Sequence, residues 1–192
     1  MLELFTRSKI RRKLILLFIY NRKKEFFLNE IARNIGTSAG TAQRELNKLL
    51  KSDLILLSKK GNLNMYSLNA RYSLLPEVES IVQKTIGIEV ELKENLGKVK
   101  GIAFALLFGS YVRGGFKSDS DIDLFIIGDP DERKVYHAVK NTEDMIGREI
   151  NFHIASKKEF ASGSKSKAFY KEIIKSHIMI CGDENEFKKL AK

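Results

Sequence analysis

The chain has 192 residues, 43% of them hydrophobic, and a formal net charge of +10 at pH 7, which allows one large domain or two small ones. Its longest apolar run, residues 14–20, is far shorter than the roughly 20 residues that span a bilayer, so we expect a soluble, cytoplasmic protein without a membrane partner. The single cysteine, Cys181, excludes an internal disulfide and a metal site with two thiolates from one chain.

The positive charge is concentrated in the first part of the chain. Residues 1–75 contain 15 Lys and Arg against 5 Asp and Glu, a net of +10, whereas residues 76–192 contain 19 of each. A basic module followed by a neutral one indicates that the first binds a polyanion and that the second has another task. Double-stranded DNA is the polyanion that we favour, and a membrane surface is the rival.

Three helices and a hairpin are predicted in the basic module. The apolar patterns predict helices over residues 9–20 and 28–35, and a third helix that Ser38 caps. Two short strands are then expected, joined by the turn KKGN with Lys59 and Lys60 at its tip. This order of elements predicts a winged helix-turn-helix.

The polar face of the third helix is the predicted DNA interface. A helix braced by its neighbours can lie in the major groove and contact base edges with long polar side chains. We assign these base contacts to Gln43, Arg44 and Asn47. Residues at the helix entry and lysines that would hold phosphates complete the interface: Thr37, Ser38, Lys48, Lys51, Lys59 and Lys60. The alternatives are a basic face that is only solvated and a protein-interaction module.

Residues 73–98 are expected to form a helical linker. Pro76 is a favoured residue at a helix start, and apolar residues then repeat on one face. These faces would pack the two modules, or two subunits, against each other. Because winged-helix proteins commonly dimerise to match two half-sites, we expect a homodimer.

The most specific motif consists of Gly109 and Ser110, ten further residues, and then Asp121 and Asp123, directly after an apolar, strand-like run. Alternate side chains of a strand share a face, so the two aspartates would point the same way about 7 Å apart, with Ile122 in the core. Two carboxylates so placed can hold Mg²⁺ or Mn²⁺. A pair of such ions would bind the phosphates of a nucleotide.

Other residues around this motif fit a phosphate ligand. Gly109 lets the backbone approach a phosphate closely, and Ser110 can donate to it at an expected helix start. Arg113 is the expected counter-charge, and Ser120 is expected to contact triphosphate oxygens. The motif therefore predicts a site for ATP or another nucleoside triphosphate. The alternative is a polar loop that only reverses the chain.

A helix to about residue 146 and a further strand are expected after the aspartates. Along that strand Glu149, Asn151 and His153 share one face. The spacing of the Gly-Ser and Asp-x-Asp motifs resembles that of the DNA polymerase beta superfamily of nucleotidyltransferases, whose neighbouring strand brings a third carboxylate to the metals. The corresponding residue here is Asn151, and Glu149 could replace it. The resemblance implies catalytic roles for Asp121, Asp123 and Glu149, with Asn151 as a further metal ligand.

As a whole, the chain resembles prokaryotic, largely archaeal, winged helix-turn-helix transcriptional regulators fused to a minimal nucleotidyltransferase domain. Besides the aspartate motif, the resemblance rests on residues 69–87, 146–154 and 167–184. It implies an α+β chain with a winged helix-turn-helix over 1–72, a helical linker over 73–98, and a nucleotidyltransferase-like domain with a mixed sheet over 99–192.

Two functions remain open on this basis. The first, which we place ahead, is a DNA-binding transcriptional regulator whose second domain binds a nucleoside triphosphate and Mg²⁺. The second is an active nucleotidyltransferase, similar to minimal members that act as antitoxins, which transfers a nucleotidyl group from ATP to a hydroxyl of a protein, such as a toxin, or of a small molecule. The first needs no third carboxylate, whereas the second needs Glu149 to complete the site. An inert scaffold is a third alternative.

Overall fold

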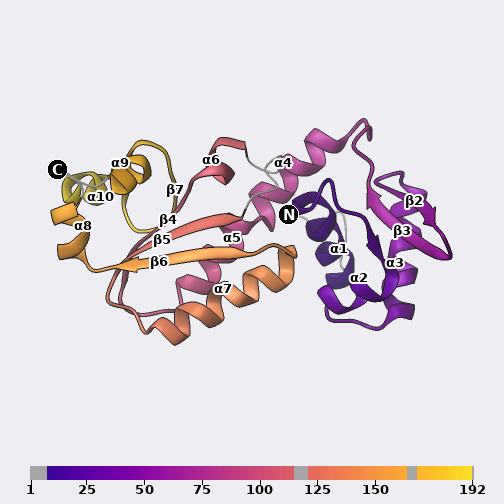
Figure 1. Cartoon of the computed structure of the whole chain (residues 1–192), viewed down its shortest axis with the longest axis horizontal. Coiled ribbons are helices and arrows are strands. Elements are labelled where there is room, and N and C mark those ends of the chain that lie inside the picture. The colour runs from indigo at the N-terminus through magenta and orange to yellow at the C-terminus, as the bar shows by residue number, and fades with distance from the viewer. Residues whose placement is uncertain (1–7, 115–120, 164–167, 192) are drawn as a thin grey trace. The chain divides into compact units, whose positions relative to one another are not determined.

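The computed structural model describes residues 8–114, 121–163 and 168–191 (Figure 1). The chain forms two compact units, which we call the N-terminal unit (Met1–Ile88 with Asp144–Arg148) and the C-terminal unit (Glu89–Glu143 with Glu149–Lys192). The boundary at Ile88 falls inside segment 73–98, which is helical over most of its length. Across the described ranges, no helix is both long enough and apolar enough to cross a membrane.

The N-terminal unit combines helices with a small antiparallel sheet. Its elements are α1 (Lys9–Tyr20), β1 (Phe26–Phe27), α2 (Leu28–Asn34), α3 (Ala39–Lys51), β2 (Ile55–Lys60), β3 (Leu63–Leu68) and α4 (Leu75–Thr85). The strands lie in the order β1-β3-β2. The helices and the hairpin predicted from the sequence are therefore present.

The hairpin turn is shorter than predicted. Lys59 pairs with Asn64 and Lys60 pairs with Leu63, so both lysines belong to β2 and do not lie at the tip of a turn. Gly61, with φ of +59°, begins the reversal, a conformation that side chains disfavour. The prediction of lysines at the tip was wrong because backbone pairing extends β2 up to this glycine.

A serine cap stabilises the start of α3, and an ion cluster at Glu45 links α3 to α1. Ser38 accepts a hydrogen bond from the backbone N–H of Thr41 at 3.3 Å, as expected of a helix cap. Glu45 of α3 accepts from Nε of Arg11 and from Nζ of Lys48, each at 2.7 Å, while its side chain is only 12% exposed. Burial raises the pKa of Glu45, but hydrogen bonds from Lys48 and Arg11 lower it by more, so the net pKa lies below its usual value.

The C-terminal unit is built on a mixed four-stranded sheet. Its elements are α5 (Ile88–Leu96), β4 (Ile102–Phe108), α6 (Ser110–Gly114), β5 (Ile122–Gly128), α7 (Glu132–Ile146), β6 (Ile150–Ala155), α8 (Lys157–Gly163), α9 (Ala168–Lys175), β7 (Ile178–Cys181) and α10 (Glu184–Leu190). The order is β6-β5-β4-β7, and only β5 and β6 are parallel. The predicted α+β class with a mixed sheet is confirmed.

An aromatic core covers one face of this sheet. Side chains of β4 and β5 pack there against buried side chains of α8, α9 and α10. The cluster comprises Phe104, Leu106, Phe108, Phe125, Ile127, Ala155, Phe160, Tyr170, Ile173 and Phe187. Figure 1 shows α9 and α10 on one side of the sheet and α7 on the other. Asp123 belongs to this same face of β5, since it alternates with Phe125.

The Glu45 cluster gives a test of the N-terminal unit. We expect Glu45→Gln to lower the free energy of unfolding by about 1 kcal/mol at pH 7, as judged by urea denaturation. A carboxylate with a lowered folded pKa stabilises the fold above its unfolded pKa of about 4.3 and loses that contribution as the pH falls through the folded pKa. The difference from the wild type should therefore disappear near pH 3. Glu77→Gln, at an exposed position of α4, is the control, and a Glu45→Gln deficit that stays constant with pH would contradict the account.

Candidate functional site

The two aspartates of the motif lie at the start of β5. Asp121 is exposed and directly precedes the strand, Ile122 is fully buried, and Asp123 is half-buried. Strand pairing places Phe108 of β4 and Asn151 of β6 opposite Asp123. Residues paired across neighbouring strands face the same side of a sheet, so Asn151 lies on the face that carries Asp121 and Asp123.

Gly109 brings the backbone against the carboxylate of Asp123. Its φ is +75°, and a Cβ added there would lie 2.5 Å from Oδ2 of Asp123. The positive φ favours glycine at this position, and a side chain there would displace the carboxylate of Asp123. The helix α6 begins at the next residue, Ser110. The Gly-Ser pair and the aspartates, which are ten residues apart in sequence, meet in one place.

The carboxylate of Asp123 carries an electrostatic cost. Burial raises its pKa, and the negative charge of Asp121 raises it further. Of the neighbouring charges, His153 and Arg113 lower the pKa and Glu172 raises it, and the net pKa is raised. Two anionic groups in a partly buried place are less stable together than apart, and a divalent cation relieves this repulsion.

The side chain next to the aspartates on β6 is the amide of Asn151 and not a third carboxylate. Nδ2 of Asn151 donates to Oδ2 of Asp121 at 3.3 Å. Glu149 precedes β6 with an exposed side chain, and its backbone oxygen accepts from the N–H of Ile122 at 3.2 Å. Among the described residues, no three His, Cys, Asp or Glu side chains form a group that could hold a metal ion.

The donor set nevertheless fits a hard divalent cation. Asp121, Asp123 and the side-chain oxygen of Asn151 are all oxygen ligands, and Mg²⁺ is commonly held by one or two carboxylates while waters and phosphates complete its coordination. The residues present are therefore compatible with Mg²⁺ or Mn²⁺.

The positive charge of Arg113 acts on Asp123, and Arg113 forms an ion pair with Glu172 that the sequence did not predict. Its Nη1 donates to Oε1 of Glu172 at 2.8 Å, which links α6 to α9. Both side chains are exposed, and both act on the pKa of Asp123. Ser120, which the sequence assigned to phosphate binding, lies outside the described residues.

Two further side chains of α9 and β6 lie near the aspartates. Phe169 is 40% exposed, and its ring centroid lies 5.9 Å from that of His153, two residues beyond Asn151. Sequence reasoning did not select Phe169 or Glu172, since neither forms a local motif and both lie more than 40 residues from Asp123 in the chain. The three-residue spacing that places them on one face of a helix was the available signal.

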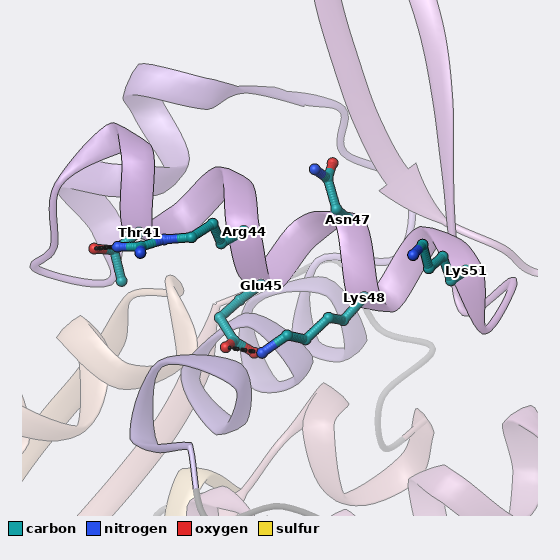
Figure 2. Close-up of a pocket in the computed structure, with 6 residues that line it drawn as sticks. All are labelled: Thr41, Arg44, Glu45, Asn47, Lys48 and Lys51. Carbon is teal, nitrogen blue, oxygen red and sulfur yellow. Dashed lines mark hydrogen bonds and ion pairs between the residues drawn. The ribbon is translucent and has the colours of Figure 1, made fainter.

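The predicted DNA-binding residues lie together on and around α3, but several are already paired. Arg44, Asn47, Lys48 and Lys51 line a hollow of about 530 Å³ with Thr41 and Glu45. Figure 2 shows Asn47 and Lys48 leaving opposite sides of the helix, and dashed lines join Lys48 to Glu45 and Arg44 to Thr41.

Further contacts join Thr37, Ser38, Gln43 and Lys60 to other residues of the N-terminal unit. Nε2 of Gln43 donates to Oδ1 of Asn47 at 2.9 Å, and the hydroxyl of Tyr66 donates to Gln43 at 3.1 Å. Lys60 forms an ion pair with Glu25 at 2.6 Å. Thr37 donates its backbone N–H to the carbonyl of Ala32 at 2.9 Å. Ser38 serves as the cap of α3.

Three known proteins are similar to this chain in part. A putative protein adenylyltransferase of Methanocaldococcus jannaschii is 33% identical over 70 aligned residues, and the match covers 29% of this chain and 67% of the relative. A crystal structure of a toxin–antitoxin with AMP-PNP covers 54% of this chain and 80% of its own, at 15% identity and a TM-score of 0.40. The structure of a tri-AMPylated Shewanella oneidensis HEPN toxin in complex with an MNT antitoxin covers 59% and 80%, at 14% identity and a TM-score of 0.36.

The assignment depends on sequence and not on these two structures, because both TM-scores are below 0.5. Residues 87–180 match the model of the Nucleotidyltransferase domain, a range that contains the Gly-Ser pair, the aspartates and Asn151. The relative from M. jannaschii supports the same assignment over two thirds of its length. The chain therefore belongs to the nucleotidyltransferase family.

Proposed function

We propose that the C-terminal unit transfers an adenylyl group from ATP to a hydroxyl of a protein. The observation that carries this proposal is the meeting of Gly109 with Asp123, beside Asp121, at the start of β5. The nucleotidyltransferase domain over residues 87–180 and a relative described as a putative protein adenylyltransferase both favour transfer. They favour it over the DNA-binding regulator that the sequence placed first.

The reaction exchanges one phosphorus–oxygen bond for another. The oxygen of the acceptor hydroxyl forms a bond to the α-phosphorus of ATP, and the bond from that phosphorus to the bridging oxygen of the β-phosphate breaks. Pyrophosphate leaves with the electron pair of the broken bond, and the hydroxyl gives up its proton to water. The chemistry therefore requires charge stabilisation at the phosphates more than a covalent intermediate.

The residues of the site have distinct roles in this scheme. Asp121, Asp123 and the oxygen of Asn151, with Glu149 as the further candidate, would hold Mg²⁺ or Mn²⁺, which supplies positive charge to the phosphates when bound. Gly109 lets the backbone lie against the carboxylate of Asp123, and Ser110, at the start of α6, would donate a hydrogen bond to a phosphate. Arg113 supplies a fixed positive charge on the same side. Ser120 remains assigned to the phosphates by sequence alone.

The acceptor that we propose is a hydroxyl of a protein. We propose a protein hydroxyl because the relative is described as a putative protein adenylyltransferase. A toxin is the protein partner implied by the resemblance to minimal nucleotidyltransferases, and a small-molecule hydroxyl is the alternative. Nucleotide binding is common to both versions.

A conservative change at Asp123 separates function from stability. We expect Asp123→Asn to lower the transfer of label from ATP to protein by at least about 100-fold, since it removes a carboxylate from the phosphate site. The same change should raise the melting temperature at pH 7, because a raised folded pKa means that the charged form costs stability. Calorimetry of the apo protein checks the second effect. Retained transfer would contradict the role of Asp123, and a lowered melting temperature would contradict the electrostatic account.

The third ligand position gives a gain-of-function test. Asn151 is the neighbour of Asp123 on β6, so we expect Asn151→Asp to tighten Mg²⁺ and to raise the transfer rate by about tenfold, which corresponds to about 1.4 kcal/mol. Glu149→Gln is the matched variant. If Glu149 completes the site, Glu149→Gln should abolish transfer. The double variant, Glu149→Gln with Asn151→Asp, should then recover transfer. Transfer unaffected by either change would rule out a third acidic ligand from β6.

We also propose that the N-terminal unit binds double-stranded DNA through α3. In this proposal residues 1–72 form the DNA-binding domain, residues 73–98 form a helical linker, and residues 99–192 form the nucleotidyltransferase-like domain. The observation that favours this is the set of long polar side chains around the 530 Å³ hollow on α3, in the part of the chain that carries the whole net charge of +10. Lys51 and Lys59 would contact phosphates. Lys48 and Lys60 would first have to leave Glu45 and Glu25. A homodimer would present two such helices to a symmetric site.

Two alanine variants test the DNA interface. Arg44→Ala should relax the sequence preference found by selection from random duplexes, because its guanidinium is assigned to base edges. Lys59→Ala should leave that preference intact and reduce the slope of log affinity against log salt by about 1. Wild-type protein that selects no sequence and binds duplexes no tighter at low salt would exclude DNA as the partner.

A further inference from the structure

We propose that Phe169 forms the platform on which the base of the bound nucleotide stacks. The inference rests on the proposed transfer function, because it takes the phosphates of the nucleotide to lie at Asp121 and Asp123. It adds a binding role for α9, which the aspartate motif does not include. The ligand class is a nucleoside triphosphate with a planar aromatic base.

The exposure of Phe169 is unusual for this part of the chain. Among the described residues of the C-terminal unit, only Phe169 and Tyr136 are large apolar side chains with substantial exposure, at 40% and 54%. The next residue, Tyr170, is buried in the aromatic core with Ile173. The core is therefore complete on this helix without the exposed area of Phe169, and leaving that area in water costs free energy.

The position of the ring is fixed by three other rings on three strands. Phe169 meets Phe108 of β4 at 5.4 Å, Phe125 of β5 at 5.8 Å and His153 of β6 at 5.9 Å between centroids. The interplanar angles are 86°, 76° and 78°, so all three contacts are edge-to-face. Such contacts are favourable and directional, and they hold the ring in place before a ligand arrives.

These same contacts place the ring next to the aspartates. Phe108 is the residue paired with Asp123, and Phe125 follows Asp123 by two residues on the same face of β5. His153 follows Asn151 by two residues on β6, and its charge acts on Asp123. The exposed ring thus packs on residues that neighbour Asp123 across the strands and along β5, which places it beside the proposed phosphate position.

The charged groups on the same helix fit this orientation. Glu172 follows Phe169 by three residues, so the two side chains lie on one face of α9. Glu172 holds Arg113 at 2.8 Å, and Arg113 is assigned to the phosphates. One helix would therefore present an aromatic surface to the base and a tethered cation to the phosphates.

Binding measurements with two ligands isolate the base. Isothermal titration of the full-length protein would use Mg²⁺ with an ATP analogue that cannot be cleaved between the α- and β-phosphates, and Mg²⁺ with inorganic tripolyphosphate, which has no base. Phe169→Leu keeps an apolar side chain over Phe108 and Phe125 but removes the aromatic face. We expect it to weaken the analogue about 5- to 150-fold, the range for loss of a base–aromatic stack, and to leave tripolyphosphate unchanged.

Two variants serve as controls. Phe169→Tyr keeps the aromatic face and should bind the analogue as the wild type does. Tyr136→Leu removes the other exposed ring of the unit, on α7, and should have no effect. Unfolding temperatures of all variants show whether the fold is retained.

The outcomes separate this inference from the function on which it rests. If Phe169→Leu binds the analogue like the wild type, or loses both ligands equally, stacking on Phe169 is overturned. If the wild type binds tripolyphosphate as tightly as the analogue, the base makes no contact and the inference fails while the phosphate site stands. If the wild type binds neither ligand, the proposed function and the inference fail together.

Discussion

The pairing of β5 with β4 on one side and with β6 on the other is the constraint on which the site depends. It sets Phe108 and Asn151 beside Asp123. Burial of Ile122 fixes this register, because a slip by one residue would turn both aspartates into the core and expose the isoleucine. The hydrophobic core therefore does more than stabilise the unit, since it aims the two carboxylates to the same side.

The aspartates lie at the edge of the aromatic core that packs on this face of the sheet. The helices α8 to α10 bury the rings beyond them, and Phe169 lies at the boundary with one part packed and one part exposed. At this boundary Asp123 is partly desolvated, and its pKa is raised by that burial and by Asp121. A fold that keeps two carboxylates in such a position at neutral pH gives up some stability, and sites of phosphate chemistry are places where this cost is expected.

Local patterns predicted the elements, and contacts distant in sequence completed the site. The helix α3 was predictable because Ala42, Leu46 and Leu49 repeat along one buried face. The extent of β2 was misjudged since lysine, glycine and asparagine in succession are typical of turns, while pairing of the backbone decides where the strand ends. No local repeat connects Glu172 or Phe169 to residue 123, so their contribution emerged only from the packing of α9 on the sheet. The sequence placed DNA binding ahead of transfer because residues 1–75 are basic and have the pattern of three helices and a hairpin, and because DNA binding needs no third carboxylate. Net charge does not register that Lys48 and Lys60 are held by carboxylates.

The position of the transferred phosphorus is the most direct test of the account. The full-length protein would be incubated with Mg²⁺ and cell lysate, once with ATP labelled at the α-phosphate and once with ATP labelled at the γ-phosphate, and the label that lysate without the protein acquires would be subtracted each time. The account predicts that a protein becomes labelled from the α position alone and that pyrophosphate is released in equal amount. Label from the γ position, or no Mg²⁺-dependent label from either position, would contradict nucleotidyl transfer as the function of this chain.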